Sequence, residues 1–431
     1  MSTAPAALRA KRRRAGMNST RRLSADFWKF FAAAFFFDLG FGLFFFLFPL
    51  YLTDLHCDER TIGHITACLT LGNVAGTLPA TMLARRFGLR PLLLFTFCTA
   101  PLVSVLRVMF LSPSAQLALA FAAGLALCCW PICFSPVVAS LTSAHNRASG
   151  FSIVFATGIG MGTCAGILGG FVPEFLHAGK MHVSLIGGMR TVLMFACAII
   201  LVGAWPLWKL RLTDQLSQPQ RRVRLFHPFL LRFLPPFILW NVVTGSFPAF
   251  GAIYLQQVLR IPLGRLGMVF SASQMVQFFA ALAAPLLVRR RGLIKGIATA
   301  QIATSVFLVL IGVTNIVSAA VVLYLAYNAM QFMCSPGIYH LLMDRIPEEE
   351  RSTASALQNL CGALCQAGTA AISGSCIVMF GYPPLLVANA ASALVSALLF
   401  LAIPRMENRP NSPAEPASAA VMEHSAECSQ S

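Results

Sequence analysis

The stretches ARRFGLRP (84–91) and VRRRGLIK (288–295) resemble each other, and this repeat is the main indication of how the chain folds. Each is a short basic cluster around a glycine, and each follows a long apolar run. The two glycines are separated by 292 − 88 = 204 positions, and the arginines two residues before them by 290 − 86 = 204. A later pair of arginines repeats the offset, 351 − 147 = 204. The constant offset predicts a duplicated chain with two similar halves.

The composition indicates that both halves lie in a lipid bilayer. The chain is 57% hydrophobic and 11% charged, with a mean hydropathy of +0.73, whereas soluble domains carry about 25% charged residues. Its apolar runs meet the requirement of about 20 residues per spanning helix many times over. They are too long and continuous for the alternating strands of a membrane barrel. We therefore expect an all-α integral membrane protein.

Twelve segments are apolar and long enough to span the bilayer, in two sets of six. Their expected bounds are 26–53, 61–84, 91–111, 116–141, 148–176 and 189–209, then 228–257, 264–288, 294–313, 316–343, 351–379 and 383–403. The polar, proline-containing stretch between the sets is typical of a linker, and the Pro-, Ser- and Ala-rich C-terminus is typical of disorder. The expected organisation is a basic tail (1–25), a six-helix bundle (26–210), a linker (211–227), a second bundle (228–404) and a disordered tail (405–431).

The net charge of +17 is distributed unevenly between alternate loops. Most Arg and Lys residues lie in the N-terminal tail, in every second loop and after the last apolar segment. The intervening loops and the helix ends next to them hold only Arg60, Arg107, Lys180, Arg190, Arg260 and Arg265. This asymmetry is typical of the positive-inside rule, so a nucleic-acid partner is not needed to explain the charge. It predicts a multi-pass protein of the plasma (cell inner) membrane with both termini and both glycine-centred loops in the cytoplasm.

Twelve spans in two halves, a polar linker, and a basic loop between the second and third helix of each half together resemble the major facilitator superfamily. The resemblance covers the chain from about Asp26 to Pro404. It implies two pseudo-symmetric six-helix bundles with a substrate site near the bilayer midplane between them. We expect such a chain to function as a monomer.

The match to the family's loop pattern, G-x-x-x-D-[RK]-x-G-[RK]-[RK], is incomplete. Arg86, Gly88 and Arg90 fit its second half, but Arg85 stands where the aspartate is expected. In the second copy Arg290 and Gly292 fit, and the acid is again missing. The arginines of the first loop therefore keep two interpretations: they form latches between the halves, or they fix the topology near anionic lipid.

A second pattern lies in the fifth span. Its sequence resembles the family's antiporter pattern G-x-x-x-G-P-x-x-G-G, with Ile167 in place of the proline. A stripe of glycines recurs there every four residues, at Gly158, Gly162, Gly166 and Gly170. Small residues at this spacing let a neighbouring helix approach closely, so we predict a packing role that tolerates rocking of the halves.

Asp38 is the most informative single residue. It lies a dozen residues into the first span, in FFFDLGFG, and therefore about 18 Å from the start of the helix at 1.5 Å per residue. An aspartate at such depth costs about 2.5–3.5 kcal/mol and usually faces a cavity. We interpret it as a proton-coupling or substrate-contacting residue, because loss of water favours the protonated form of a carboxyl group. The alternative is a structural aspartate that is hydrogen-bonded to a neighbouring helix.

The resemblance implies that the first, fourth, seventh and tenth spans line the substrate cavity. The polar and aromatic residues expected there, besides Asp38, are Trp130, Asn241, Tyr327, Asn328 and Gln331. Each amide has an equally good interpretation as an interhelical hydrogen bond worth about 0.6 kcal/mol. Trp130 has an alternative interpretation as an anchor at the membrane interface.

These features favour a secondary active transporter that works by alternating access. The sequence contains no phosphate-binding G-x-x-x-x-G-K-[ST] loop, and we find no set of residues for nucleophilic or metal catalysis, so we expect neither an enzyme nor a cofactor or metal. The predicted cavity lacks Arg and Lys, which argues against phosphate or dicarboxylate as the main substrate, and its aromatic and amide lining suits a neutral or cationic amphiphile. Proton-coupled efflux of such a compound, by antiport, is the function that we expect. Uptake of a small polar metabolite is the alternative, and a non-transporting membrane sensor with a transporter fold is a further one.

Overall fold

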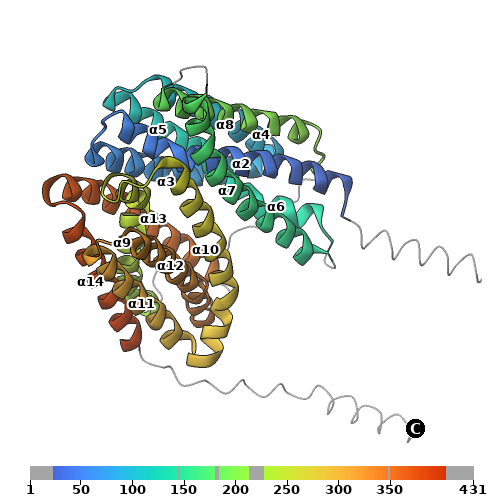
Figure 1. Ribbon diagram of the computed structural model, residues 1–431. Coiled ribbons are helices and arrows are strands. Elements are labelled where there is room, and N and C mark those ends of the chain that lie inside the picture. The colour runs from blue at the N-terminus through green and yellow to red at the C-terminus, as the bar shows by residue number, and fades with distance from the viewer. Residues whose placement is uncertain (1–22, 144–145, 180–183, 213–227, 348–349, 404–431) are drawn as a thin grey trace, which may run out of the picture.

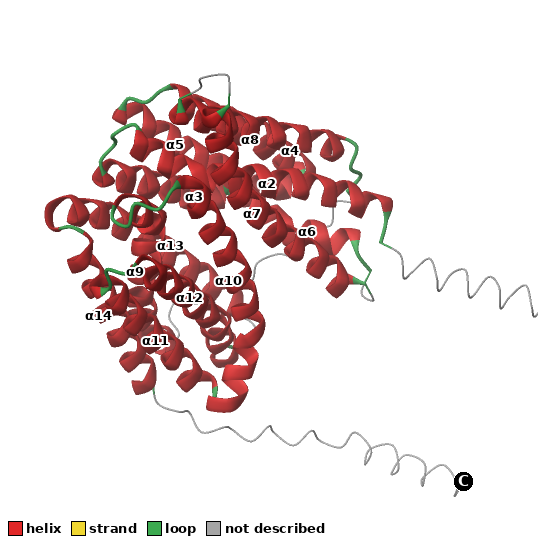
Figure 2. Cartoon of the chain, in the orientation of Figure 1, coloured by secondary structure: helices red, strands yellow, loops and turns green. Residues whose placement is uncertain are grey.

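The computed structural model describes residues 23–143, 146–179, 184–212, 228–347 and 350–403. Within these ranges the chain is helical apart from short turns, and no strand occurs (Figure 2). Twelve of the described segments are long and apolar enough to cross a membrane. The all-α membrane fold that hydropathy predicts is confirmed.

The helices form two sets that correspond to the expected halves. The first half contains α2 (Ala25–Asp54), α3 (Glu59–Phe87), α4 (Leu89–Met109), α5 (Pro113–Leu127), α6 (Cys129–Leu141), α7 (Arg147–Ala178) and α8 (Leu185–Trp208). The second half contains α9 (Pro228–Gln257), α10 (Leu263–Arg291), α11 (Leu293–Val313), α12 (Val317–Arg345), α13 (Arg351–Phe380) and α14 (Tyr382–Ala402). Of the expected tail (1–25) only residues from 23 onward are described, and of the linker (211–227) only residues up to 212. The tail predicted at 405–431 lies outside the described residues.

The duplication extends to backbone geometry and single hydrogen bonds. Helices α3 and α10 begin 263 − 59 = 204 residues apart, and α4 and α11 begin 293 − 89 = 204 residues apart. The hydroxyl of Tyr51 donates to the Val108 carbonyl, and that of Tyr254 donates to the Ile311 carbonyl, an offset of 203 for both donor and acceptor. The two halves are therefore copies of one structural unit.

One expected helix, 116–141, is interrupted. The span consists of α5 and α6, which are separated by a turn at Cys128. Pro131 lies in the first turn of α6 and has no N–H to donate to the carbonyl of Leu127, so the ladder of helical hydrogen bonds cannot continue through this point. The expectation of one continuous helix was wrong here, although the two pieces still form a single span.

The two halves meet at one end and diverge toward the other (Figure 1). We call the end that carries the turns at Gly88 and Gly292 the basic end, and the end that carries the turns after α2 and α9 the far end. Across the interface, α3 packs against α13 and α7 packs against α10. Buried aromatic and aliphatic side chains fill the core of each half.

The described contacts between the halves lie between the middle of the helices and the far end. The hydrogen bonds across the interface run from Gln256 to Asp54 (2.9 Å), from the Gly264 N–H to Glu174 (2.7 Å) and from Ser271 to the Thr163 carbonyl (2.7 Å). Backbones also approach closely there: a Cβ at Gly63 would lie 2.5 Å from the Ala370 carbonyl oxygen. The far end is therefore closed.

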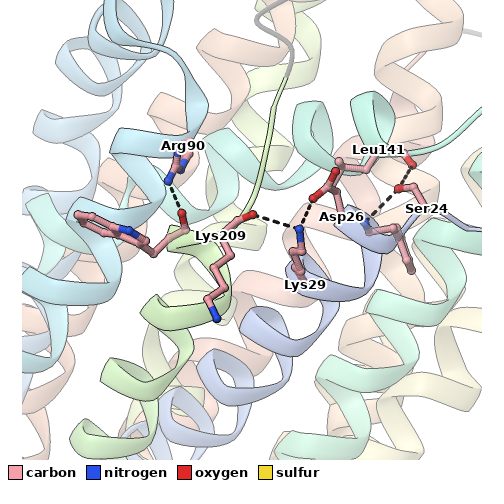
Figure 3. Close-up of polar contacts among 8 residues, drawn as sticks. Ser24, Asp26, Lys29, Arg90, Leu141 and Lys209 are labelled. Carbon is pink, nitrogen blue, oxygen red and sulfur yellow. Dashed lines mark hydrogen bonds and ion pairs between the residues drawn. The ribbon is translucent and has the colours of Figure 1, made fainter.

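At the basic end, hydrogen bonds connect helices of the first half to one another (Figure 3). Lys29 donates to Asp26 (2.8 Å) and to the Lys209 carbonyl (3.1 Å), and Arg90 donates to the Trp208 carbonyl. Helix C-termini leave carbonyl groups without helical partners and carry partial negative charge. Cationic side chains satisfy these carbonyls at the end of α8, and this part of the first half is held together without help from the second half.

Candidate functional site

Asp38 occupies the middle of α2, 38 − 25 = 13 residues after the first residue of the helix and 54 − 38 = 16 before the last. Its side chain is half-buried. The carboxylate lies against α7 at a glycine: a Cβ at Gly158 would be 3.3 Å from Oδ2 of Asp38. Gly158 therefore leaves room for the acid between the two helices.

The Asp38 carboxylate has no hydrogen bond or ion pair in the described part of the chain. The ion pairs there are Lys29 with Asp26 and Arg345 with Asp344, and no described donor reaches Asp38. If Asp38 had only a structural role, its oxygens would be expected to accept hydrogen bonds from donors on neighbouring helices, because a buried charge without partners is costly. This geometry leaves the oxygens of Asp38 available to a proton or a ligand.

Aromatic rings surround the residue that precedes Asp38. The ring of Phe37 stacks on Trp130 with 4.4 Å between centroids, and Phe30 stacks on the same indole at 5.9 Å. Phe97 lies 5.7 Å from Trp130 and Phe134 lies 5.9 Å from it. Trp130 is the second residue of α6, just beyond the break at Cys128, and it belongs to this cluster of rings from α2, α4 and α6. Its role in substrate binding stays a prediction.

The glycine stripe of α7 faces two different helices. Gly158 faces Asp38 of α2, whereas a Cβ at Gly162 would meet Nε2 of Gln274 in α10 at 2.5 Å. Toward the far end, Gly166 and Gly170 lie against α10, and a Cβ at Gly170 would be 2.9 Å from the Leu263 carbonyl oxygen. The stripe thus lies where the halves approach each other. Its role during rocking of the halves stays a prediction.

In the second half, Asn241 belongs to a hydrogen-bonded group. Its Nδ2 donates to the Phe237 carbonyl (2.8 Å), and its Oδ1 accepts from Nε2 of Gln366 in α13 (2.9 Å). Gln366 also donates to the hydroxyl of Thr244 (3.2 Å). Asn241 is buried and links α9 to α13, as in the interhelical alternative.

The three candidates on α12 are buried but differ in their contacts. Asn328 donates to the Tyr324 carbonyl (2.8 Å) and accepts from Gln277 of α10 (3.3 Å). Tyr327 packs against Phe247 with 5.6 Å between ring centroids. The Tyr327 hydroxyl and Oε1 of Gln331 have no hydrogen-bond partner among the described residues. These two atoms are available to a ligand if the helices around them separate.

Sequence reasoning did not assign to the candidate site two polar residues that the structure places near its members. Gln366 completes the Asn241 group, and Gln274 is the amide that reaches α7 one turn from Gly158. Gln366 follows the buried Gln358 by eight residues, and this helical spacing places both on one face of α13 and could have identified it. The inter-half contact of Gln274 has no such signal, because it depends on how the two halves dock.

In the duplicated basic loops, the glycines have a backbone role, whereas the arginine side chains are largely exposed. Gly88 has φ 85° and Gly292 has φ 80°, a region that favours glycine. Arg85, Arg86 and Arg290 are exposed, and Arg90 donates to a carbonyl of its own half. The latch interpretation needs contact between the basic ends, which diverge in this conformation, so both interpretations of the arginines stay open.

The described residues contain no group of three or more His, Cys, Asp or Glu side chains placed to hold a metal ion. The arrangement offers an unpaired carboxylate and aromatic rings in the first half and amides in the second half. A duplicated bundle of twelve candidate spans with these features is typical of a membrane transporter.

Comparison with known proteins identifies its family. Residues 30–370 match the family model of the Major Facilitator Superfamily, and the chain belongs to this superfamily. It is therefore a transporter and not an enzyme, as predicted. A search of curated proteins found no match.

Solved structures show the same fold at low sequence identity. The nucleoside transporter NupG superposes with a TM-score of 0.74 at 14% identity, covering 88% of this chain and 99% of its own. A D-xylose-proton symporter gives 0.71 at 13% identity, covering 87% and 96%. The inward-open xylose transporter XylE from E. coli gives 0.68 at 13% identity, covering 89% and 98%. At this identity the likeness establishes the fold alone.

Proposed function

We propose that the chain is a secondary active transporter that exports a neutral or cationic amphiphile in exchange for protons, with Asp38 as the coupling residue. The observation that carries this proposal is the unpaired, half-buried carboxylate of Asp38 at the middle of α2. It lies beside Gly158, and the preceding residue, Phe37, belongs to the aromatic cluster around Trp130. A cation is attracted both by the carboxylate and by the faces of aromatic rings.

Competition at one carboxylate gives a physical basis for antiport. A proton and a cationic substrate both stabilise Asp38 by neutralising its charge, and binding of one removes the attraction for the other. If the two bundles change conformation only when Asp38 is neutralised, each cycle carries a proton one way and the substrate the other. Binding can shift such an equilibrium only through different affinities for the two states, so this exchange requires that the proton and the substrate each bind the two states differently.

The arrangement of the halves supports alternating access. Their contacts close the far end, whereas the basic ends diverge (Figure 1). If the positive-inside distribution sets the orientation, the basic end and both termini face the cytoplasm of a cell with this protein in its plasma (inner) membrane. The conformation then corresponds to an inward-facing state of a monomer, ready to take substrate from the cytoplasm.

The amides of the second half would contribute selectivity. Tyr327 and Gln331 hold polar atoms without partners in the described residues, and Asn241 and Asn328 hold amides that could exchange partners on binding. Uptake of a small polar metabolite is the competing proposal, because hydrogen-bonding amides also suit such a substrate. The charge of the preferred substrate distinguishes the two proposals.

Flux into proteoliposomes tests this function. Purified protein is reconstituted with an imposed pH gradient, and a panel of lipophilic cations, neutral amphiphiles, nucleosides and sugars is offered. Substrate-dependent proton movement with cations or neutral amphiphiles is the expected result. Flux of sugars or nucleosides alone would favour the uptake permease. No movement of any compound and no proton response would overturn the transport proposal and favour the sensor alternative.

A further inference from the structure

A cavity of about 550 Å³ lies at the far end of the second half, away from Asp38. It is formed by the turn between α9 and α10, the first turns of α10, and the first turns of α12. None of the predicted substrate-binding residues lines it. The function proposed above therefore does not account for this cavity.

The mouth of the cavity carries two arginines. Arg260 ends the turn after α9 and Arg265 lies in the first turn of α10, and both side chains are exposed. In the described part of the chain no carboxylate forms an ion pair with either guanidinium. Arg260 has φ 51°, a left-handed conformation that a branched or bulky residue adopts only under structural constraint. Two cations are thus held at one site without an ion pair to a described carboxylate.

The other half of the duplicated chain shows that these arginines are not required by the fold. At an offset of 204, His56 corresponds to Arg260 and shares its left-handed conformation, with φ 62°. Thr61 corresponds to Arg265, and Asp58 corresponds to Pro262. The first half therefore builds the same turn without arginine at these two positions, and its own Arg60 and Glu59 correspond to Gly264 and Leu263. The positive charge in the second half is also unusual for this end of the protein, where Arg and Lys are scarce.

The walls of the cavity are apolar and partly exposed at the surface of two candidate membrane spans. Met268 of α10 and Val317 of α12 are 47% and 43% exposed, within segments that span the membrane. Val317, Val321 and Leu325 recur every four residues and form one stripe on α12. Eight residues of helix correspond to about 12 Å at 1.5 Å per residue. The result is an apolar groove of that length with two cations at the end nearest the membrane surface.

We propose that this groove binds an anionic glycerophospholipid. Its phosphate would contact the guanidinium groups of Arg260 and Arg265, which present planar sets of donors that fit phosphate oxygens. An acyl chain would lie between α10 and α12 along the stripe from Val317 to Leu325. The paired cations select for a negative head group, and the apolar walls select for a lipid chain over a free anion.

Retention of lipid on the purified full-length protein tests this proposal. Wild-type protein in detergent is incubated with phosphatidylglycerol or with phosphatidylcholine, and bound lipid is counted by native mass spectrometry. We expect phosphatidylglycerol to bind more tightly than phosphatidylcholine. Each arginine near the surface contributes about fivefold in affinity, so Arg260→Gln with Arg265→Gln weakens phosphatidylglycerol binding about 30-fold.

Two further variants serve as controls: one removes an arginine elsewhere on the protein, and the other fills the groove without changing the charge. Arg190→Gln removes another exposed arginine toward the far end, in α8, and should leave binding unchanged. Val321→Trp fills the groove without changing charge and should reduce binding of the same lipid. Equal binding of both lipids by wild type, or unchanged phosphatidylglycerol binding after removal of both arginines, would overturn the proposal. Transport activity is not part of this readout, so failure here leaves the proposed function unaffected.

Discussion

The carboxylate of Glu174 is predicted to hold the far end closed. Glu174 lies near the end of α7 in the first half and accepts a hydrogen bond from the Gly264 N–H in the second half (2.7 Å). Gly264 is the second residue of α10, so the carboxylate caps the N-terminus of a helix that belongs to the other half. Replacement by glutamine keeps the shape of the side chain but removes its charge.

The size of the effect follows from the charge alone. A hydrogen bond to a charged group contributes about 1.5–3 kcal/mol and one between neutral groups about 0.5–1.5 kcal/mol. Glu174→Gln should therefore weaken the contact by about 1 kcal/mol, which corresponds to a change of about fivefold in an equilibrium constant. Because this bond exists only when the far ends are together, the change shifts the population toward the state that is open at the far end.

Distance measurements between spin labels at Phe110 and Ile316 report this population. Both side chains are exposed, at 56% and 65%, and they lie in equivalent far-end turns of the two halves. The chain has 13 cysteines, so the labels are attached through non-cysteine chemistry. Glu174→Gln should increase the ratio of the longer to the shorter distance about fivefold.

A matched control is available within one half. Asp58 also accepts a hydrogen bond from the N-terminus of a helix, the Thr61 N–H (3.1 Å), but that helix belongs to its own half. Asp58→Asn should therefore leave the distance distribution unchanged. An unchanged distribution in Glu174→Gln, or an equal change in both variants, would refute the reasoning.

Three further predictions concern backbone geometry, packing and pH. Gly292→Ala should destabilise the protein by about 1–3 kcal/mol, because alanine is strained at φ 80°. Gly160→Ala, in a helix, is the control and should not destabilise it, because open space surrounds the Cβ position at both sites. Equal melting temperatures of the two variants in thermal unfolding would contradict this prediction. Gly72→Val should lower the melting temperature through a loss of about 1–3 kcal/mol, because its side chain would overlap the Phe121 carbonyl in the contact between α3 and α5; an unchanged melting temperature would show that the helices separate freely. The hydrogen bond that Asp58 accepts from Thr61 keeps the pKa of its carboxyl group below the ordinary value of 3.8. As the cap of α3, the ionised Asp58 contributes about 1 kcal/mol to the stability of the folded protein above that pH. This contribution is lost as the pH falls below 3.8 and the carboxylate becomes protonated. The difference in stability between wild type and Asp58→Ala should thus shrink between pH 6 and pH 3, and a constant difference would contradict the assignment.

The helices and the duplication could be predicted from the sequence because both depend on local composition. A helix in lipid must be predominantly apolar over about 20 residues, so runs such as Phe27 to Leu52 identify the spans with little ambiguity. The offset between Gly88 and Gly292 is recorded directly in residue numbers. The break at Cys128 was missed, although Pro131 was visible, because a proline bends or interrupts a membrane helix only in some contexts.

The candidate site was predictable only in part. Asp38 is conspicuous because an acid in an apolar span is rare, and the structure places it at mid-helix without a described partner. The partners of Asn241 and the contact between Glu174 and Gly264 could not be predicted. They pair residues far apart in the sequence, and the second of them depends on which conformation the two halves adopt.

Proton-driven transport by Asp38→Asn in proteoliposomes tests the central claim most directly. Asp26→Asn is the matched control, because Asp26 is a partly exposed acid in the first turn of the same helix and is paired with Lys29. Thermal unfolding of both variants verifies that each is folded. The account predicts that Asp38→Asn abolishes flux coupled to the pH gradient while Asp26→Asn retains it. Proton-driven transport retained by a folded Asp38→Asn variant would contradict the claim that Asp38 couples transport to protons.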